Sequence, residues 1–161
     1  MTPFTLLHVA LSLVGILAGA VVMLGMLQAR RLPGWTALFL STTLATTLTG
    51  FLFPFNGFTP AIGTGLVSSV VLVVLLFALY RSKLQGGART VFALTATISL
   101  YLNLFVLVVQ SFLKIPALHA LAPLGTEPPF AAAQGVVLLA SIALGYFCVK
   151  AARHRTSAFA F

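Results

Sequence analysis

Apolar residues fall into five stretches long enough to cross a bilayer, and proline, glycine or charged residues fill each gap between them. A transmembrane helix needs about 20 mostly apolar residues to cross about 30 Å of hydrocarbon. Each stretch is predicted to be helical, because backbone polar groups in lipid must be satisfied within the segment and no long run alternates like a barrel strand. The pattern predicts an all-α integral membrane bundle, a single transmembrane domain of residues 1–161, with five transmembrane helices near residues 6–27, 35–53, 61–80, 90–113 and 130–149.

The first apolar stretch is predicted to remain in the protein as a helix. The alternative is a cleaved signal peptide, which would have a basic segment before a shorter apolar run. No basic residue precedes residue 6, so the helix is the preferred interpretation.

The basic residues predict the orientation of the bundle. Eight of the nine Lys and Arg residues lie after the first and third spans or in the tail 150–161, and the ninth is Lys114. Cytoplasmic loops of membrane proteins collect Lys and Arg. The N-terminus is therefore predicted to lie outside and the C-terminus in the cytoplasm, with an ordered outer loop at 115–129 and a short basic cytoplasmic tail at 150–161.

Composition excludes two broad classes. The chain is 60% hydrophobic and only 6% charged, whereas soluble domains average roughly 25% charged residues. The net charge of +8 could suggest nucleic-acid binding. The basic residues lie at the ends of spans, however, and leave no basic face on a soluble element, so nucleic acid is not an expected partner.

The fourth span carries one stripe of polar residues. Helical spacing places Ser99, Asn103, Gln110 and Lys114 on a common face. Asn103 lies roughly 16 Å from Lys114 along the helix, at about 1.5 Å per residue, and is therefore near the middle of the membrane. Because an amide facing lipid is costly, Asn103 is predicted to face the interior of the bundle.

Polar groups also gather on the predicted outer side. Glu127 is the only acidic residue of the chain; it can cap the fifth span, which begins after Pro128 and Pro129, and Lys114 is its one ionic partner on that side. Two interpretations stay open: a salt bridge with hydrogen bonds that fix the bundle, or a site for a ligand, ion or proton. The candidate binding residues are His8, Asn103, Gln110, Lys114, His119, Glu127 and Gln134.

The sequence offers little catalytic chemistry. It has no Asp, its single cysteine is Cys148 near the inner end of the fifth span, and no metal-binding motif is visible. Two axial histidines for a haem would have to be His8 and His119, since the third histidine is cytoplasmic. The chain is therefore interpreted as more consistent with a non-enzyme, and its cofactors are unknown.

Four segments carry a family resemblance. They are YLNLFVLVVQ at 101–110, KIPALHALAP at 114–123, EPPF at 127–130 and TGFLFPF at 49–55. They resemble a family of small, uncharacterised bacterial inner-membrane proteins, and the resemblance covers most of the chain. It implies a stand-alone, multi-pass protein of the bacterial inner membrane and no particular activity.

Three functions fit these observations. The first is non-enzymatic binding or transport of a small molecule, lipid or ion in a polar pocket on the outer side. The second is an accessory subunit of a larger membrane complex, such as a redox complex, in which the small-residue faces would contact a protein partner or a second copy of the chain. The third is a subunit that binds haem or quinone. In each case the lipid bilayer is the surrounding solvent.

Overall fold

The computed structural model describes residues 2–28, 30, 32–53 and 60–154. The tail beyond residue 154, including the basic residue Arg155, lies outside the described residues, as do Arg31 and positions 54 and 55 of the TGFLFPF segment. Within the described residues the chain is all helical and has no strand, which confirms the predicted all-α class. The helices are α1 (Pro3–Leu27), α2 (Pro33–Gly50), α3 (Pro60–Leu76), a π-helical turn η1 (Phe77–Arg81), α4 (Ala88–Lys114), α5 (Pro116–Leu121) and α6 (Pro128–His154).

Proline begins most of these helices. Pro3, Pro33, Pro60, Pro116 and Pro128 are the first residues of α1, α2, α3, α5 and α6. The fixed backbone angle of proline suits the first helical position, where its missing N–H group is not needed. The predicted spans begin two or three residues late at α1, α2 and α6 and one residue late at α3, because an apolar pattern does not count the proline turn as part of the span.

Four helical segments are long and apolar enough to cross a membrane, judged by length and composition over the described residues. They are α1, the continuous segment Ile62–Arg81, α4, and α6 as far as Arg153. These segments indicate a membrane protein with several spans. Helix α2 has 18 residues and does not reach the same apolarity, because hydroxyl side chains occupy much of its length.

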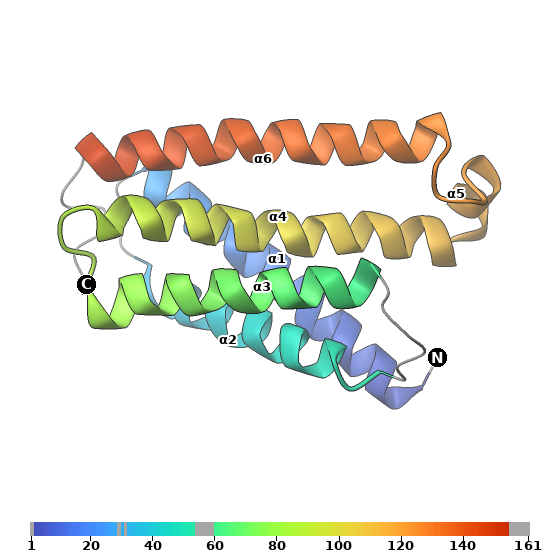
Figure 1. Ribbon diagram of the computed structural model, residues 1–161, viewed down its shortest axis with the longest axis horizontal. Coiled ribbons are helices and arrows are strands. Elements are labelled where there is room, and N and C mark those ends of the chain that lie inside the picture. The colour runs from blue at the N-terminus through green and yellow to red at the C-terminus, as the bar shows by residue number, and fades with distance from the viewer. Residues whose placement is uncertain (1, 29, 31, 54–59, 155–161) are drawn as a thin grey trace.

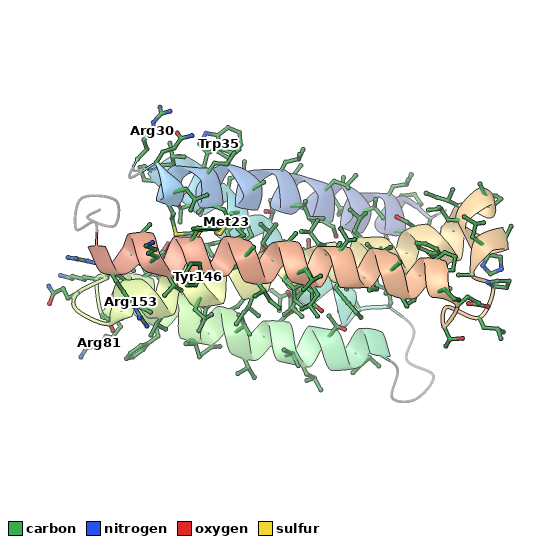
Figure 2. The ribbon with its side chains drawn as sticks, turned by 90° about the horizontal axis from the view of Figure 1, so that it is seen from above. Met23, Arg30, Trp35, Arg81, Tyr146 and Arg153 are labelled. Carbon is green, nitrogen blue, oxygen red and sulfur yellow. The ribbon has the colours of Figure 1, made fainter. Side chains whose placement is uncertain are left out.

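The long helices run side by side, and α4 has the central position (Figure 1). Helix α4 packs against α1, α3 and α6, while α2 packs against α1 and α3. Arg30, Arg81 and Arg153 lie at one end of the bundle (Figure 2), which we call the basic end. The opposite end carries α5 (Figure 1), and we call it the loop end.

Helices α1 and α2 form a hairpin whose contacts advance in register along both helices. His8 bonds Thr49, Gly15 lies against Thr42, Gly19 lies against Phe39, and Gly25 lies against Leu32. A Cβ added at Gly19 would lie only 2.8 Å from Cε2 of Phe39 and 3.1 Å from Cδ1 of Leu100 on α4. The small residues of α1 therefore let two other helices approach it closely, as small-residue faces do in membranes.

Burial differs between the two halves of α4. In the half near the basic end, most residues from Phe92 to Leu100 are buried against the other helices. In the other half, every residue from 101 to 111 is only half-buried. The apolar core of the bundle, which includes Met23, Phe39, Leu75 and Cys148, thus encloses α4 more completely near the basic end.

The loop after η1 is held by a dense set of bonds. The N–H of Ser82 donates to the carbonyl of Phe77 at 3.0 Å, and the N–H of Leu84 donates to that of Ala78 at 3.1 Å. Leu84 is buried although its φ of +52° lies in the left-handed region that non-glycine residues rarely adopt. The guanidinium Nε of Arg89 donates to the Leu84 carbonyl at 2.9 Å and fastens this turn to α4.

Candidate functional site

A polar contact joins α4 to α2 near the middle of the bundle. The side-chain amide of Asn103 donates to the hydroxyl of Thr43 at 3.3 Å. Thr43 is 2% exposed and Asn103 is half-buried. Asn103 therefore faces the interior of the bundle, as its depth in the span predicts. The hydrogen bond offsets part of the cost of placing an amide in an apolar layer.

Glycine on α1 makes room for this contact. A Cβ at Gly15 would lie 3.1 Å from the hydroxyl oxygen of Thr42 and 3.5 Å from that of Thr43. The Thr42 hydroxyl donates to the backbone carbonyl of Leu38 at 2.7 Å, a bond within its own helix. Thr43 instead accepts a bond from another helix. The sequence did not single out Thr43, because α2 contains many hydroxyl residues and no pattern distinguishes Thr43 from the others.

Two buried hydroxyl oxygens, each within about one helical turn of Asn103 or Thr43 along its own helix, have no hydrogen-bond partner in the described part of the chain. They belong to Ser99, one turn from Asn103 on α4, and to Thr46, three residues after Thr43 on α2. We call Ser99, Asn103, Thr43 and Thr46 the mid-bundle polar group. An unpaired buried polar atom costs about 1–3 kcal/mol. Each of the two oxygens would therefore gain from a polar group that enters the bundle.

His8 lies at the loop end of the α1–α2 hairpin. Its ring Nδ1 lies 2.8 Å from the Thr49 hydroxyl oxygen, and that hydroxyl also lies 2.7 Å from the carbonyl oxygen of Ala45. The His8–Thr49 contact thus joins α1 to α2, and which of the two atoms donates depends on the tautomer of the ring. The ring also packs edge-on against Phe53, with 5.1 Å between ring centroids.

The two glutamines have different surroundings. The amide of Gln134 on α6 donates to the carbonyl of Phe105 on α4 at 3.2 Å, and its own oxygen is buried without a partner among the described residues. Gln110 is half-buried, and its amide forms no hydrogen bond with any residue that the structure describes. Gln134 thus lies at the α4–α6 contact, whereas Asn103 lies at the α4–α2 contact.

The loop between α5 and α6 holds Glu127 in a way that the sequence did not predict. Its carboxylate accepts the backbone N–H groups of Leu124 and Thr126, both at 2.9 Å. The bond from Leu124 is the largest cause that holds the pKa of Glu127 below its ordinary value. The ion pair between Glu127 and Lys114 that the charges suggested does not form among the described residues. Nearby backbone N–H groups bond the carboxylate instead, and the Lys114 side chain is exposed.

Glu127 does occupy the capping position of α6. Its backbone carbonyl accepts the N–H groups of Phe130 and Ala131, both at 3.1 Å, and Pro128 takes the first helical position. The carboxylate, however, points back to the loop rather than to the helix. His119 is exposed on α5, so neither of these loop residues contacts the mid-bundle polar group through a hydrogen bond in the described chain.

Acid is expected to release this loop. A carboxyl group whose pKa in the folded state lies below its unfolded value of about 4.3 stabilises the fold above that value, and the contribution is lost as pH falls through the lower folded pKa. Hydrogen exchange at the amides of Leu124 and Thr126 should therefore lose its protection below about pH 4. The Glu127→Gln variant should start less protected at neutral pH and show no such transition; identical profiles for the two proteins would contradict the role of the carboxylate.

The seven predicted site residues thus divide into separate places instead of one cluster. His8 bonds Thr49 on α2, Asn103 bonds Thr43 on α2, and Gln134 bonds the carbonyl of Phe105 on α4. Lys114 and His119 are exposed at the loop end. Hydroxyl and amide groups dominate the buried part of the set. Such groups suit the recognition of a polar ligand by hydrogen bonds, and no group of three or more His, Cys, Asp or Glu residues within the described chain is placed to hold a metal ion.

No known protein family, curated protein or solved structure matches this chain. The resemblance to small bacterial inner-membrane proteins therefore stays a prediction from the sequence. The functional argument has to rest on the bundle and on the polar groups inside it.

Proposed function

We propose that the chain is a five-span protein of the bacterial inner membrane and that α2 is the fifth span. The register of the α1–α2 hairpin supports this, because α2 follows α1 from the level of His8 to the level of Gly25. A helix of 18 residues is about 27 Å long, close to the thickness of the hydrocarbon layer. Most hydroxyls of α2, such as those of Thr42 and Thr47, donate to carbonyls of their own helix, which lowers the cost of placing them in lipid.

The proposed orientation places the basic end in the cytoplasm and the loop end outside. Arg30, Arg81 and Arg153 lie together at the basic end (Figure 2). Lys114 is the only basic residue that begins or ends a described helix at the loop end. A Lys and Arg excess on one side is the strongest sequence determinant of orientation for short loops.

Within this bundle we propose a non-enzymatic site that binds a small molecule or lipid with a polar head. The observation that carries the proposal is the mid-bundle polar group, in which the Asn103 amide bonds Thr43 and the buried hydroxyls of Ser99 and Thr46 have no partner in the described chain. The half-buried stretch 101–111 of α4 leads from this group towards the loop end. It carries Gln110, whose amide has no hydrogen bond within the described chain. A polar ligand there would satisfy groups that the protein leaves unpaired.

The candidate residues would have distinct roles in such a site. Asn103 and Gln110 would donate and accept hydrogen bonds along α4, and the imidazole ring of His8 would add a further polar group at the loop end of α1. Lys114 and His119 would lie at the entrance, where their exposed side chains meet solvent. Glu127 would keep the loop in place rather than contact the ligand.

Removal of the amides tests this site. The variants Asn103→Leu and Gln110→Leu should lose co-purified or added lipid from a polar lipid extract, measured by native mass spectrometry in mild detergent, and should keep a thermal midpoint close to that of the wild type. Ser111→Ala is a matched control, because the Ser111 hydroxyl donates to the carbonyl of Leu107 in its own helix. Binding by both leucine variants at the wild-type level would refute the proposal.

The same spectra address the accessory-subunit alternative. A protein that binds no lipid or small molecule but is isolated with a second protein, or as a defined multimer, would favour that role. The mass of the intact assembly distinguishes the two functions directly.

A further inference from the structure

The basic end carries positive charge that no acidic side chain of the chain can neutralise. The chain has one acidic residue, and Glu127 bonds the backbone of its own loop at the opposite end. Exposed cations that have no counter-charge in their own protein attract anions from the surroundings. The exposed basic residues of the described chain near the basic end are Arg30, Arg81, Lys83, Lys150 and Arg153.

The exposed face of α6 changes from apolar to aromatic to basic along the helix. Helical spacing places the six residues of this face, named at the end of this paragraph, within about a third of a turn of one another. All of them are exposed, and Tyr146 is 62% exposed at the change from apolar to basic. Figure 2 shows Tyr146 and Arg153 towards the basic end of α6. The face consists of Val136, Leu139, Ile142, Tyr146, Lys150 and Arg153.

Helix α3 and its π-helical turn show the same order. Val70, Val73 and Phe77 are exposed and apolar, and they lead to Tyr80, which is 67% exposed, and to Arg81. Both α3 and α6 pack against α4. Two neighbours of α4 therefore present an apolar stripe, then a tyrosine, then a basic residue, in that order towards the basic end.

This order matches the layers of a phospholipid. Acyl chains lie against apolar side chains, tyrosine prefers the boundary between hydrocarbon and headgroups, and Lys and Arg meet the phosphate. A guanidinium can form two parallel hydrogen bonds with a phosphate. The apolar, aromatic and basic residues are continuous along each helix, so the face favours an amphiphile with a negative headgroup.

We propose that the basic ends of α3 and α6 form a binding surface for phospholipids with anionic headgroups, centred on Arg81, Lys150 and Arg153. Arg89 is outside this set because its guanidinium Nε is held by the Leu84 carbonyl. The surface is separate from the mid-bundle polar group and does not depend on which side of the membrane the basic end faces.

Titration of phosphatidylglycerol into the full-length protein in neutral detergent, followed by native mass spectrometry, tests the surface. The wild type should bind phosphatidylglycerol more tightly than phosphatidylcholine. The double variant Lys150→Gln/Arg153→Gln should bind phosphatidylglycerol about 30-fold more weakly, given the typical contribution of two basic residues near a lipid surface. The variant Lys150→Arg/Arg153→Lys, which keeps both charges, should retain binding.

The control double variant Arg30→Gln/Lys83→Gln removes the same net charge from exposed residues outside this set and should keep most of the affinity. Both double variants change exposed side chains only, and equal thermal midpoints in neutral detergent would show that they fold. Equal losses in the two double variants would mean diffuse charge attraction and would overturn the proposal. Equal binding of phosphatidylcholine, or displacement of the lipid by inorganic phosphate at the same concentration, would overturn it as well.

Discussion

The variant Gly19→Leu should yield little folded protein. The Cβ of any side chain at this position would lie 2.8 Å from the ring of Phe39 and 3.1 Å from Leu100. Phe39 is completely buried, so its ring cannot move aside into solvent or lipid. Forcing extra methylenes into a packed core costs about 1–3 kcal/mol, and the site joins three helices at once. Size-exclusion chromatography and the thermal midpoint in mild detergent would measure the loss; Gly19→Ala should lower the midpoint without abolishing folding.

Gly135 provides a matched control within a helix. A Cβ at Gly135 would meet no atom within 4 Å, so Gly135→Ala should leave the midpoint unchanged or raise it through the higher helix propensity of alanine. Shortening the opposing ring with Phe39→Leu in the Gly19→Ala background should recover part of the lost stability. A Gly19→Leu protein as stable as the wild type would show that α1, α2 and α4 do not meet at this glycine.

Cysteine labelling should give an all-or-none answer on the five-span topology. Cysteines introduced at Leu52 and Leu124, near the loop end, should react with a membrane-impermeant maleimide added to intact cells. Cysteines at Gly34 and Gln85, near the basic end, should react only after lysis. The four positions are exposed, whereas the native Cys148 is completely buried and should give little background.

Each alternative topology has its own labelling pattern. Exchange of the two classes would reverse the orientation. Labelling of Leu52 and Gly34 from the same side would mean that α2 does not cross the membrane, whatever the result at the other two positions. The wild-type chain, which has only the buried cysteine, controls for labelling of broken cells.

The sequence predicts the helices well because hydropathy and helix length depend on local composition. It also predicts that Asn103 faces the interior of the bundle, because an amide near the middle of the membrane is costly when it faces lipid. It does not predict Thr43 as the partner. Helical periodicity says which face a residue occupies but not which neighbour lies opposite, and α2 offers several hydroxyls within two turns. Gly15 of α1 lies against both Thr42 and Thr43, and this close approach is also invisible to periodicity.

The details at the helix ends escaped prediction for another physical reason. Charge complementarity suggested that Glu127 would pair with Lys114, but backbone N–H groups one and three residues away in the turn are already fixed next to the carboxylate. The π-helical turn at Phe77–Arg81 leaves no sign in the sequence, because it alters the spacing of hydrogen bonds without altering the apolar composition. Both features depend on exact backbone geometry.

The central position of α4 has a consequence for how the protein is made. Helices enter the membrane in chain order, and the α1–α2 hairpin can pair fully once residue 50 has been synthesised, because all its contacts lie before that point. Leu100 and Asn103, which close over Gly19 and Thr43, arrive only after α3 has been inserted. During that interval the nascent hairpin presents glycines and unpaired hydroxyls on one side. We expect this to be the period when wrong helix pairing, or capture by membrane quality control, competes most strongly with folding.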